Sequence, residues 1–199
     1  MTAVEDSPKI DGRRARGEKK RQAIVEATLR VIERDGLAGV THRSVAREAG
    51  VPTTAPTYYF ATLDDLLIAT LTWSAEALCD DMLKIVASGG TAREIATILA
   101  KAVNENRGRT LAEYELYLLA GRRPELRAAA RRWLDLAIEA VRPADPVAFR
   151  ALLAAVDGLL IQGLIADVAP NEDELEPIVS FLICGRDDFT AATREQWKS

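Results

Sequence analysis

The sequence contains few of the residues that build catalytic centres, metal sites or disulfide frameworks. It has 1 His and 2 Cys among 199 residues, and Cys79 and Cys184 lie far apart, each in an apolar stretch with helical spacing. A histidine pair, a Cys/His ligand set and a network of disulfides are therefore excluded. A glycine-rich phosphate loop and a nucleophile motif are also missing. We expect a protein that is not an enzyme, with no metal, no cofactor and two reduced, buried thiols.

Turn-forming and strand-forming residues are also scarce. The chain has 12 Gly and 8 Pro, and Ala, Leu, Glu and Arg dominate long stretches in place of the residues that favour strands. A hydrophobic fraction of 48% is enough for a sizeable folded core. We predict an all-α protein of about nine helices.

The chain also lacks a long uninterrupted apolar run. Its first residues carry charges where a signal peptide needs an apolar segment, and its most apolar stretch, residues 151–166, is interrupted by Asp157 and Gln162. A membrane-spanning helix needs about 20 predominantly apolar residues. We therefore expect a cytoplasmic protein that does not associate with a membrane.

Positive charge is concentrated at the start of the chain, although the net charge is −4. Residues 1–60 contain 11 Lys or Arg against 8 Asp or Glu, and the remainder contains 15 against 22, so the two parts carry +3 and −7. Seven of the eleven cations fall within residues 9–21. Such a basic segment on an acidic protein indicates local contact with phosphates or an anionic surface. A solvated tail without a partner fits this composition equally well.

Apolar spacing predicts three helices in the first third of the chain, the third of them short. The first spans residues 18–35, and the second is a short helix that begins at the Thr41 cap and ends at Gly50. The segment "GVPTTAPTYYF", residues 50–60, then forms a turn and a third short helix. Two short helices joined by such a turn have the spacing of a helix-turn-helix, whose second helix enters the major groove of DNA. Further helices are predicted at residues 62–87, 92–106, 111–120, 125–141, 147–167 and 172–183.

Residues 18–67 resemble the DNA-binding domain of the TetR family of bacterial regulators. The similarity lies in "AIVEATLRVIERDGLAGVTHRSVAREAGV", followed by "TYYF" and "LDDLL". The resemblance implies a homodimeric repressor with an N-terminal three-helix domain and a larger helical domain for ligand binding and dimerisation. We accordingly divide the chain into a flexible basic arm at residues 1–17, a helix-turn-helix domain at 18–61 and a ligand-binding and dimerisation domain at 62–199.

The resemblance also assigns residues to DNA contact. Thr41 and Arg43 match the start of the family's second helix, and Thr53 and Thr54 match the start of its recognition helix. His42 lies beside the cap, where it is either a phosphate contact or a solvated bystander. The full set of candidate DNA-binding residues is Arg13, Arg14, Arg16, Thr41, His42, Arg43, Thr53, Thr54, Thr57, Tyr58 and Tyr59.

Within the recognition helix, the resemblance assigns opposite faces to neighbouring residues. Thr57 takes a position usually held by a DNA-facing tyrosine, and Tyr59 takes one often held by a phosphate-binding histidine. Tyr58 matches an aromatic that packs partly into the domain, and Phe60 is expected to pack beside it. Pro56 is tolerated if Thr53 or Thr54 caps the helix, because backbone N–H groups in the first turn have no partner within the helix.

The chain departs from the family at Ala55, Pro56 and Leu63. Leu63 stands where a lysine often contacts a phosphate, so one cationic contact is missing, and the arm residues Arg13, Arg14 and Arg16 compensate if they reach the DNA backbone or minor groove. These departures keep an alternative open, in which the chain is a helical adaptor that binds protein or an anionic surface through its arm and has lost DNA binding.

For the C-terminal domain the sequence yields two candidate sets. The resemblance implies a pocket for an apolar or amphipathic effector, although aromatics at helical spacing also fit plain core packing. Its candidate lining residues are Trp73, Met82, Tyr114, Tyr117, Leu118, Trp133, Phe149, Leu153 and Asp157. A stripe on the helix at 147–167, together with the helix after it, fits either intramolecular packing or a dimer interface on a pseudo-palindromic operator. The candidate interface residues are Leu152, Ala155, Leu159, Gln162, Gly163, Ala166 and Phe181.

Overall fold

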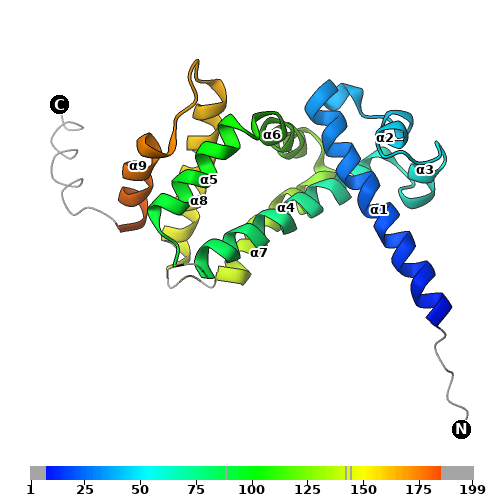
Figure 1. The fold of residues 1–199 in the computed structure, drawn as a ribbon, viewed down its shortest axis with the longest axis horizontal. Coiled ribbons are helices and arrows are strands. Elements are labelled where there is room, and N and C mark those ends of the chain that lie inside the picture. Colours follow the sequence, from blue (N-terminus) through cyan, green and yellow to red (C-terminus); the bar gives the residue numbers. More distant parts are fainter. Residues whose placement is uncertain (1–7, 88, 142, 144, 185–199) are drawn as a thin grey trace, which may run out of the picture. The chain divides into compact units, whose positions relative to one another are not determined.

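The computed structural model of the chain describes residues 8–87, 89–141, 143 and 145–184. Within these residues the backbone forms nine α-helices, two short 3-10 helices and no strand (Figure 1), so the all-α prediction is confirmed. Contacts divide the chain into two compact units. The described part of the first unit covers residues 8–78 and 111–135, and that of the second covers 79–110 and 136–184 with the gaps noted.

The first unit is built around α1. It contains α1 (Pro8–Asp35), the 3-10 turn Leu37–Gly39, α2 (His42–Glu48), α3 (Ala55–Tyr59), the first part of α4 (Leu63–Ala87), most of α6 (Arg107–Arg122), the 3-10 turn Pro124–Leu126 and the start of α7 (Arg127–Val141). Its core joins fully buried Ile24 and Val31 of α1 to Leu66 of α4 and Leu116 of α6. The unit therefore includes residues 111–135, which lie beyond the segment that resembles a DNA-binding domain.

The start of α1 corrects the sequence-based expectation. The helix begins at Pro8, not at Glu18, so residues 8–17 extend α1 as a helix. The extension contains three Arg, one Lys and one Ala, which are strong helix formers, and a proline is well tolerated in the first helical turn. The earlier expectation failed because Gly12, Gly17 and the missing apolar face obscured this helical propensity.

The second unit consists mainly of three helices. They are α5 (Ala92–Asn104), α8 (Pro146–Ile165) and α9 (Glu172–Cys184), joined by the end of α4 and the end of α7. Buried side chains of α5 and α9 form its core, with Leu99 against Leu175 and Val179. Arg93 of α5 reinforces this packing through ion pairs with carboxylates of α9, including Glu176 at 2.9 Å. Pairs this exposed add little stability, so the apolar contact dominates.

Close packing of α8 on α5 depends on Gly163. A Cβ atom at this position would lie 2.9 Å from Cγ1 and 3.2 Å from Cβ of Val103, closer than such atoms normally approach. The guanidinium of Arg107 also donates to the carbonyl oxygens of Gly163, at 3.4 Å, and Leu164. The close approach that a mid-helix glycine permits therefore occurs within the chain itself, and a place for Gly163 in a dimer interface stays a prediction.

The Gly163 contact predicts that two Gly→Ala substitutions change the stability of the chain in different directions. Gly163→Ala should lower the free energy of unfolding by about 1–3 kcal/mol, since the added methyl overpacks against Val103. Gly121→Ala in α6, where a Cβ would meet nothing within 4 Å, should instead leave stability unchanged or raise it by up to about 1 kcal/mol. Denaturant unfolding monitored by circular dichroism measures both. Adding Val103→Ala should recover part of the Gly163→Ala loss, and independent, additive effects would contradict the contact.

Candidate nucleic-acid interface

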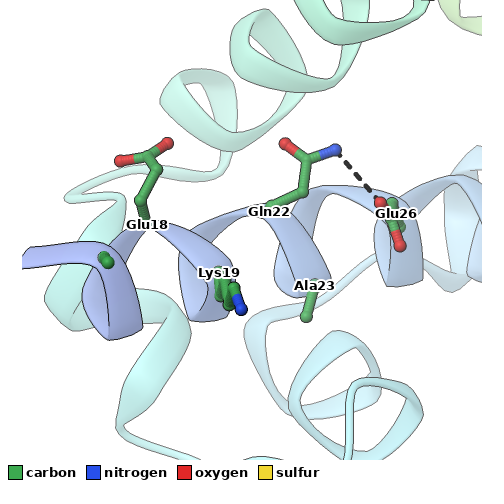
Figure 2. A pocket seen from close by; sticks show the side chains of 6 residues that line it. Glu18, Lys19, Gln22, Ala23 and Glu26 are labelled. Carbon is green, nitrogen blue, oxygen red and sulfur yellow. Dashed lines mark hydrogen bonds between the residues drawn. The ribbon is translucent and has the colours of Figure 1, made fainter. Parts of the chain in front are cut away.

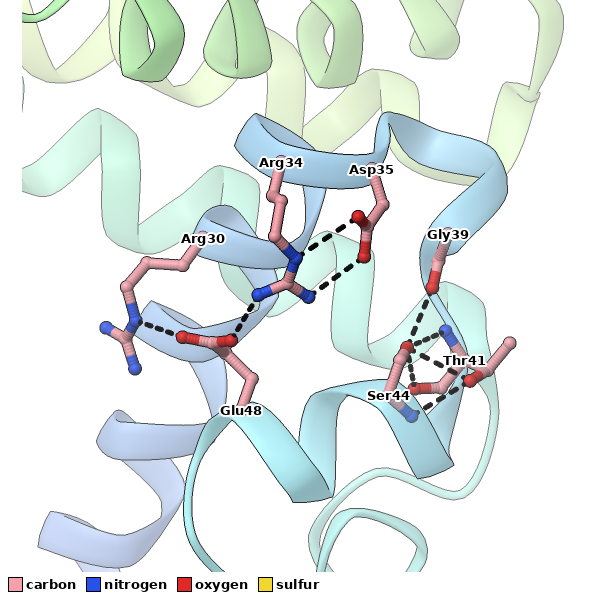
Figure 3. A network of polar contacts seen from close by, with 7 residues as sticks. All are labelled: Arg30, Arg34, Asp35, Gly39, Thr41, Ser44 and Glu48. Atoms are coloured by element: carbon pink, nitrogen blue, oxygen red, sulfur yellow. Dashed lines mark hydrogen bonds and ion pairs between the residues drawn. The ribbon is translucent and has the colours of Figure 1, made fainter.

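The start of α2 is fixed by a reciprocal cap. Thr41 Oγ1 accepts from the Ser44 backbone N–H at 3.0 Å, and Ser44 Oγ accepts from the Thr41 N–H at 2.9 Å (Figure 3). Ser44 Oγ also donates to the carbonyl oxygen of Gly39 at 2.7 Å. The capping role predicted for Thr41 is confirmed. Ser44 was missed, because a capping box is normally recognised by Glu or Gln at this position.

Charged side chains clamp α2 onto α1. Glu48 of α2 accepts from Arg30 Nε at 3.0 Å and from Arg34 at 2.6 Å, and Arg34 also pairs with Asp35 at 2.9 Å (Figure 3). Hydrogen bonds from Arg34 and then Arg30 lower the pKa of Glu48 below its ordinary value. The hydrogen bond from Arg34 likewise lowers the pKa of Asp35. The network connects α2 to α1 at the surface of the unit.

A left-handed glycine and two backbone hydrogen bonds fix the conformation of the turn between α2 and α3. Gly50 adopts a φ of 63°, a left-handed conformation that favours glycine. The N–H of Val51 donates to Ala46 O at 3.0 Å and that of Gly50 to Arg47 O at 3.3 Å, which is the hydrogen-bond pattern of a Schellman cap. The predicted end of α2 at Gly50 is thus explained by its conformation, and the chain leaves α2 in a fixed direction.

Pro56 lies in the permissive first turn of α3. The helix is capped by Thr54, and the proline is its second residue, where no N–H is required. The predicted location is confirmed, with two differences: α3 begins at Ala55, and the Thr54 side chain makes no capping hydrogen bond. Pro56 is also buried. It therefore anchors the short helix against the domain.

Tyr58 and Tyr59 point in directions opposite to those predicted, with Tyr58 outward and Tyr59 inward. Tyr58 is 83% exposed, whereas Tyr59 is half-buried and packs against the core of the first unit. Their rings meet edge to face with centroids 5.0 Å apart. Thr57 is exposed as expected, and Phe60 is buried at 3% exposure. Thr57 and Tyr58 therefore form the outward face of α3, and the assignment of Tyr59 to that face is wrong.

The other candidate DNA-binding residues occupy varied surroundings. Arg43, Thr53 and Thr54 are exposed near the same α2–α3 motif, and Arg16 is exposed on α1. His42 is half-buried, and its Nε2 has no hydrogen-bond partner among the described residues. The side chains of Arg13 and Arg14 lie outside the described residues. The motif thus presents hydroxyls, the phenol of Tyr58 and the guanidinium of Arg43 on adjoining turns, which are groups that donate to phosphates and base edges.

Comparison with known proteins identifies this motif. A model of the bacterial regulatory proteins of the tetR family matches residues 24–70, and a model of the tetracyclin repressor-like C-terminal domain matches residues 90–184. The structure of a member of the TetR family from Streptomyces coelicolor A3 is 36% identical, with a TM-score of 0.66, and the match covers 82% of this chain and 97% of that one. The chain belongs to the TetR family.

Two further relatives of this TetR family protein are similar along most of their length. The transcriptional regulator PksA of Bacillus subtilis is 28% identical over 81% of this chain and 87% of its own. The crystal structure of the multidrug binding protein EbrR complexed with ethidium is 37% identical, with a TM-score of 0.68, and covers 82% of this chain and 97% of that one. The present chain is accordingly a helix-turn-helix transcriptional regulator of the TetR family.

Candidate pocket residues fall in both units of this TetR family chain. In the first unit Trp73 packs partly against the core, Tyr114 and Trp133 are half-buried, and Tyr117 and Leu118 are exposed. The second unit holds Leu153, which is buried, and half-buried Phe149 and Asp157. The side chain of Met82 lies outside the described residues. These residues remain candidates for a pocket.

Candidate interface residues outline a partly uncovered face on α8. Leu159 packs partly against the core of the second unit, and Leu152, Ala155, Ala166 and Phe181 are half-buried. Gln162 is exposed. By length and composition α8 is apolar enough to cross a membrane, yet only 17% of its apolar window is buried within the chain. Despite Asp157 and Gln162, α8 is therefore long and apolar enough to qualify as a membrane-spanning helix, contrary to the sequence-based argument.

A shallow hollow on α1 holds no recognisable ligand site. Its volume is about 440 Å³, it is open to solvent, and all its walls come from one helix (Figure 2). Within it the amide of Gln22 donates to Glu26 at 3.1 Å. Among the described residues no group of three His, Cys, Asp or Glu side chains is placed to hold a metal ion.

The Glu48 network predicts that substitution of Glu48 lowers the melting temperature by an amount that depends on pH. The pKa of Glu48 is lower in the folded chain than in the unfolded chain, so its stabilisation is present above the ordinary pKa of about 4.3 and is lost as pH falls through the folded value. Glu48→Gln should therefore lower the melting temperature at pH 5–7, and the gap from the natural chain should close below about pH 4.

Thermal unfolding by circular dichroism at several pH values measures this difference. The matched control is Glu33→Gln, an exposed glutamate on α1 with no ion pair among the described residues. It should produce a much smaller gap with no comparable pH dependence. A gap for Glu48→Gln that stays constant down to pH 3 would contradict the contribution of the ion pairs.

Proposed function

We propose that the chain is a repressor that acts in the cytoplasm as a homodimer and leaves its operator when a small molecule binds. The observation that carries this proposal is the geometry of the α2–α3 motif, in which a fixed turn and a buried Pro56 present Thr57 and Tyr58 to solvent. A hydroxyl and a phenol on the outward face of a recognition helix suit the major groove. Arg43 at the start of α2 adds a donor for the phosphate backbone.

The uncovered apolar face of α8 and α9 supports a dimer. Ile161 and Ile165 of α8 are 43% and 78% exposed, and Ile178 of α9 is 44% exposed. Apolar residues on two adjacent helices favour a symmetric four-helix contact between two copies. Two copies would present two α3 helices to a pseudo-palindromic operator, with half-sites near a multiple of the ~34 Å helical repeat.

The effector we propose is an aromatic or amphipathic molecule, and a cationic one in particular. The multidrug binding protein EbrR has been crystallised with ethidium, with proflavin and with malachite green, and these dyes are aromatic cations. Residues 61–199 of the present chain carry a net charge of −7, which favours cations over anions. Half-buried Asp157 of the second unit supplies a carboxylate suited to such a ligand.

The proposed response is a shift between two dimer conformations. An effector moves this equilibrium only as far as its affinities for the two conformations differ. The element best suited to transmit the shift is α4, a continuous helix whose residues 63–78 belong to the first unit and 79–87 to the second. It starts three residues after Phe60, next to the recognition helix.

The orientation of the two tyrosines predicts opposite outcomes for their substitution. Tyr58→Ala should weaken operator binding roughly tenfold through a lost phosphate or base contact, and should change stability by no more than about 0.5 kcal/mol. Tyr59→Ala should lower the free energy of unfolding by roughly 2 kcal/mol, because its ring packs on the core. Fluorescence anisotropy on an operator selected from a random duplex library, together with denaturant unfolding, measures both.

Two results of that experiment would contradict the proposal. If the natural chain formed no sequence-specific complex with DNA, the proposal that it is a repressor would fail. Loss of operator affinity in Tyr59→Phe, which removes only a hydroxyl, with no loss in Tyr58→Ala would restore the orientation expected from the sequence.

If an effector releases the protein from its operator, the release should depend on binding of the effector to the protein and not to the DNA. Malachite green should bind the free protein, and it should reduce the affinity for the operator by a factor equal to its own preference for the released conformation. Asp157→Asn should weaken dye binding, and with it the release. Because cationic dyes also bind DNA directly, the complex with a random duplex is the control. Equal dye effects on the operator and random complexes would count against an effector-driven release.

A further inference from the structure

The end of the recognition helix is in contact with α1. Tyr58 is exposed, Tyr59 is half-buried, and Phe60, which ends α3, is buried. Two positions of α1, Gly17 and Arg21, lie next to this end of α3. They are four positions apart, about one helical turn, so they share one side of α1. That side of α1 therefore faces the end of the recognition helix.

Arg21 lies over the ring of the residue that ends α3. The carbon of its guanidinium is 5.2 Å from the centroid of the Phe60 ring, a distance at which the face of an aromatic ring attracts a cation. The backbone N–H of Phe60 donates to Pro56 O at 2.8 Å and closes the last turn of α3. Glu18, one turn earlier on α1, pairs with Arg21 at 3.5 Å. Arg21 therefore holds the recognition helix at its last turn.

The missing side chain at Gly17 leaves space for the phenol of Tyr59. A Cβ atom at this position would lie 3.8 Å from the hydroxyl oxygen of Tyr59, which is an ordinary van der Waals contact. A methyl group therefore fits, whereas the further carbons of a larger side chain would press on the phenol. Gly17 lies within α1, where glycine is less favourable than any residue except proline. The space beside Tyr59 accounts for a glycine at this position.

The ring of Tyr59 supports the outward ring of Tyr58. The two rings meet edge to face, with centroids 5.0 Å apart and an interplanar angle of 88°, a preferred geometry for aromatic pairs. An exposed side chain without such a neighbour samples several rotamers. The contact favours one direction for the phenol of Tyr58, and it links that direction through Tyr59 to Gly17 of α1.

We propose that Gly17 and Arg21 of α1 are positioning residues for DNA recognition. Gly17 sets the direction of Tyr58 through the ring of Tyr59. Arg21 holds the end of α3 through the ring of Phe60. Neither residue needs to touch DNA in this role. The inference rests on the proposed function, in which Tyr58 contacts the operator.

The first test enlarges the side chain at position 17 in two steps. Gly17→Ala should leave operator affinity unchanged, because a methyl group fits against the phenol. Gly17→Ile should weaken operator binding by up to the roughly tenfold factor expected for Tyr58→Ala. The χ1 angle of a β-branched side chain is nearly fixed in a helix, so isoleucine cannot turn away from the phenol. Fluorescence anisotropy on the selected operator measures both variants.

The matched control for Gly17→Ile is Ala15→Ile, at an exposed position of the same helix. It should bind the operator as tightly as the natural chain. Gly17→Ile raises the helix propensity of α1 and Ala15→Ile lowers it, so an effect of helix stability alone would weaken the control and not the test variant. Circular dichroism checks that both variants fold.

The second test asks whether the effect of position 17 acts through Tyr58. In a chain that already carries Tyr58→Ala, Gly17→Ile should cause little further loss of operator affinity, because substitutions of residues that act as a unit are not additive.

The third test separates positioning by Arg21 from a direct contact with phosphate. Arg21→Gln should weaken operator binding by about threefold to tenfold. The slope of affinity against salt should equal that of the natural chain, because no phosphate contact is lost. Arg131→Gln, which removes an exposed guanidinium from α7, is the control of equal charge and should change neither affinity nor slope.

Three outcomes would overturn the inference and leave the proposed function intact. In the first, Tyr58→Ala weakens operator binding but Gly17→Ile loses no more affinity than Ala15→Ile. In the second, the loss in Gly17→Ile is undiminished when Tyr58→Ala is present. In the third, Arg21→Gln lowers the salt slope by about 1 per protomer, which would make Arg21 a direct phosphate contact. If Tyr58→Ala itself kept full operator affinity, the contact in the proposed function would fail, and this inference would fail with it.

Discussion

The short length of α2 and α3 constrains the whole DNA-binding unit. They contain 7 and 5 residues, and isolated helices of fewer than about 12 residues are marginal in water. Their position therefore comes from the elements around them. Val45 of α2 and Phe60 after α3 are buried in the same core as Ile24 and Val31 of α1. This shared core, with the Glu48 ion pairs at its surface, positions the recognition helix relative to α1.

This dependence leaves α3 with little surface for reading bases. Its sequence is Ala-Pro-Thr-Tyr-Tyr, and of these residues only Thr57 and Tyr58 are exposed. Neither makes the bidentate contacts with which arginine or asparagine distinguishes guanine or adenine. A motif of this kind gains much of its affinity from phosphates, and any strong base preference must come from residues at the start of α2 or from the shape of the DNA.

Local signals in the sequence were sufficient for the outline of the motif. Thr41, Gly50 and Pro56 each carry a conformational preference that acts within a few residues, and the structure places all three as expected. The relative orientation of Tyr58 and Tyr59 was not accessible in this way. In a five-residue helix a phase difference of one residue, about 100°, exchanges the inner and outer faces, and too few apolar positions exist to define that phase.

Contacts between distant residues were beyond the sequence for a different reason. Glu48 pairs with Arg34 and Arg30, which lie 14 and 18 positions earlier. The sequence around a glutamate does not indicate which arginine it will pair with. Gly163 illustrates the same limit in a core, because a mid-helix glycine predicts a close approach without saying to what. Its partner is Val103, whereas the stripe on α8 alone fits an intermolecular contact equally well.

The division of charge between the two ends of the sequence explains how an acidic protein can act on DNA. At 0.1 M salt the Debye length is about 10 Å, so those of the acidic residues that lie farther than this from a bound duplex act on it only weakly. Cations that lie directly on phosphates are screened far less. Exposed cations such as Arg43 on α2 can therefore contact phosphates despite the larger negative total. The same acidic remainder favours cationic ligands over anionic ones, in agreement with the class of effector proposed for the chain.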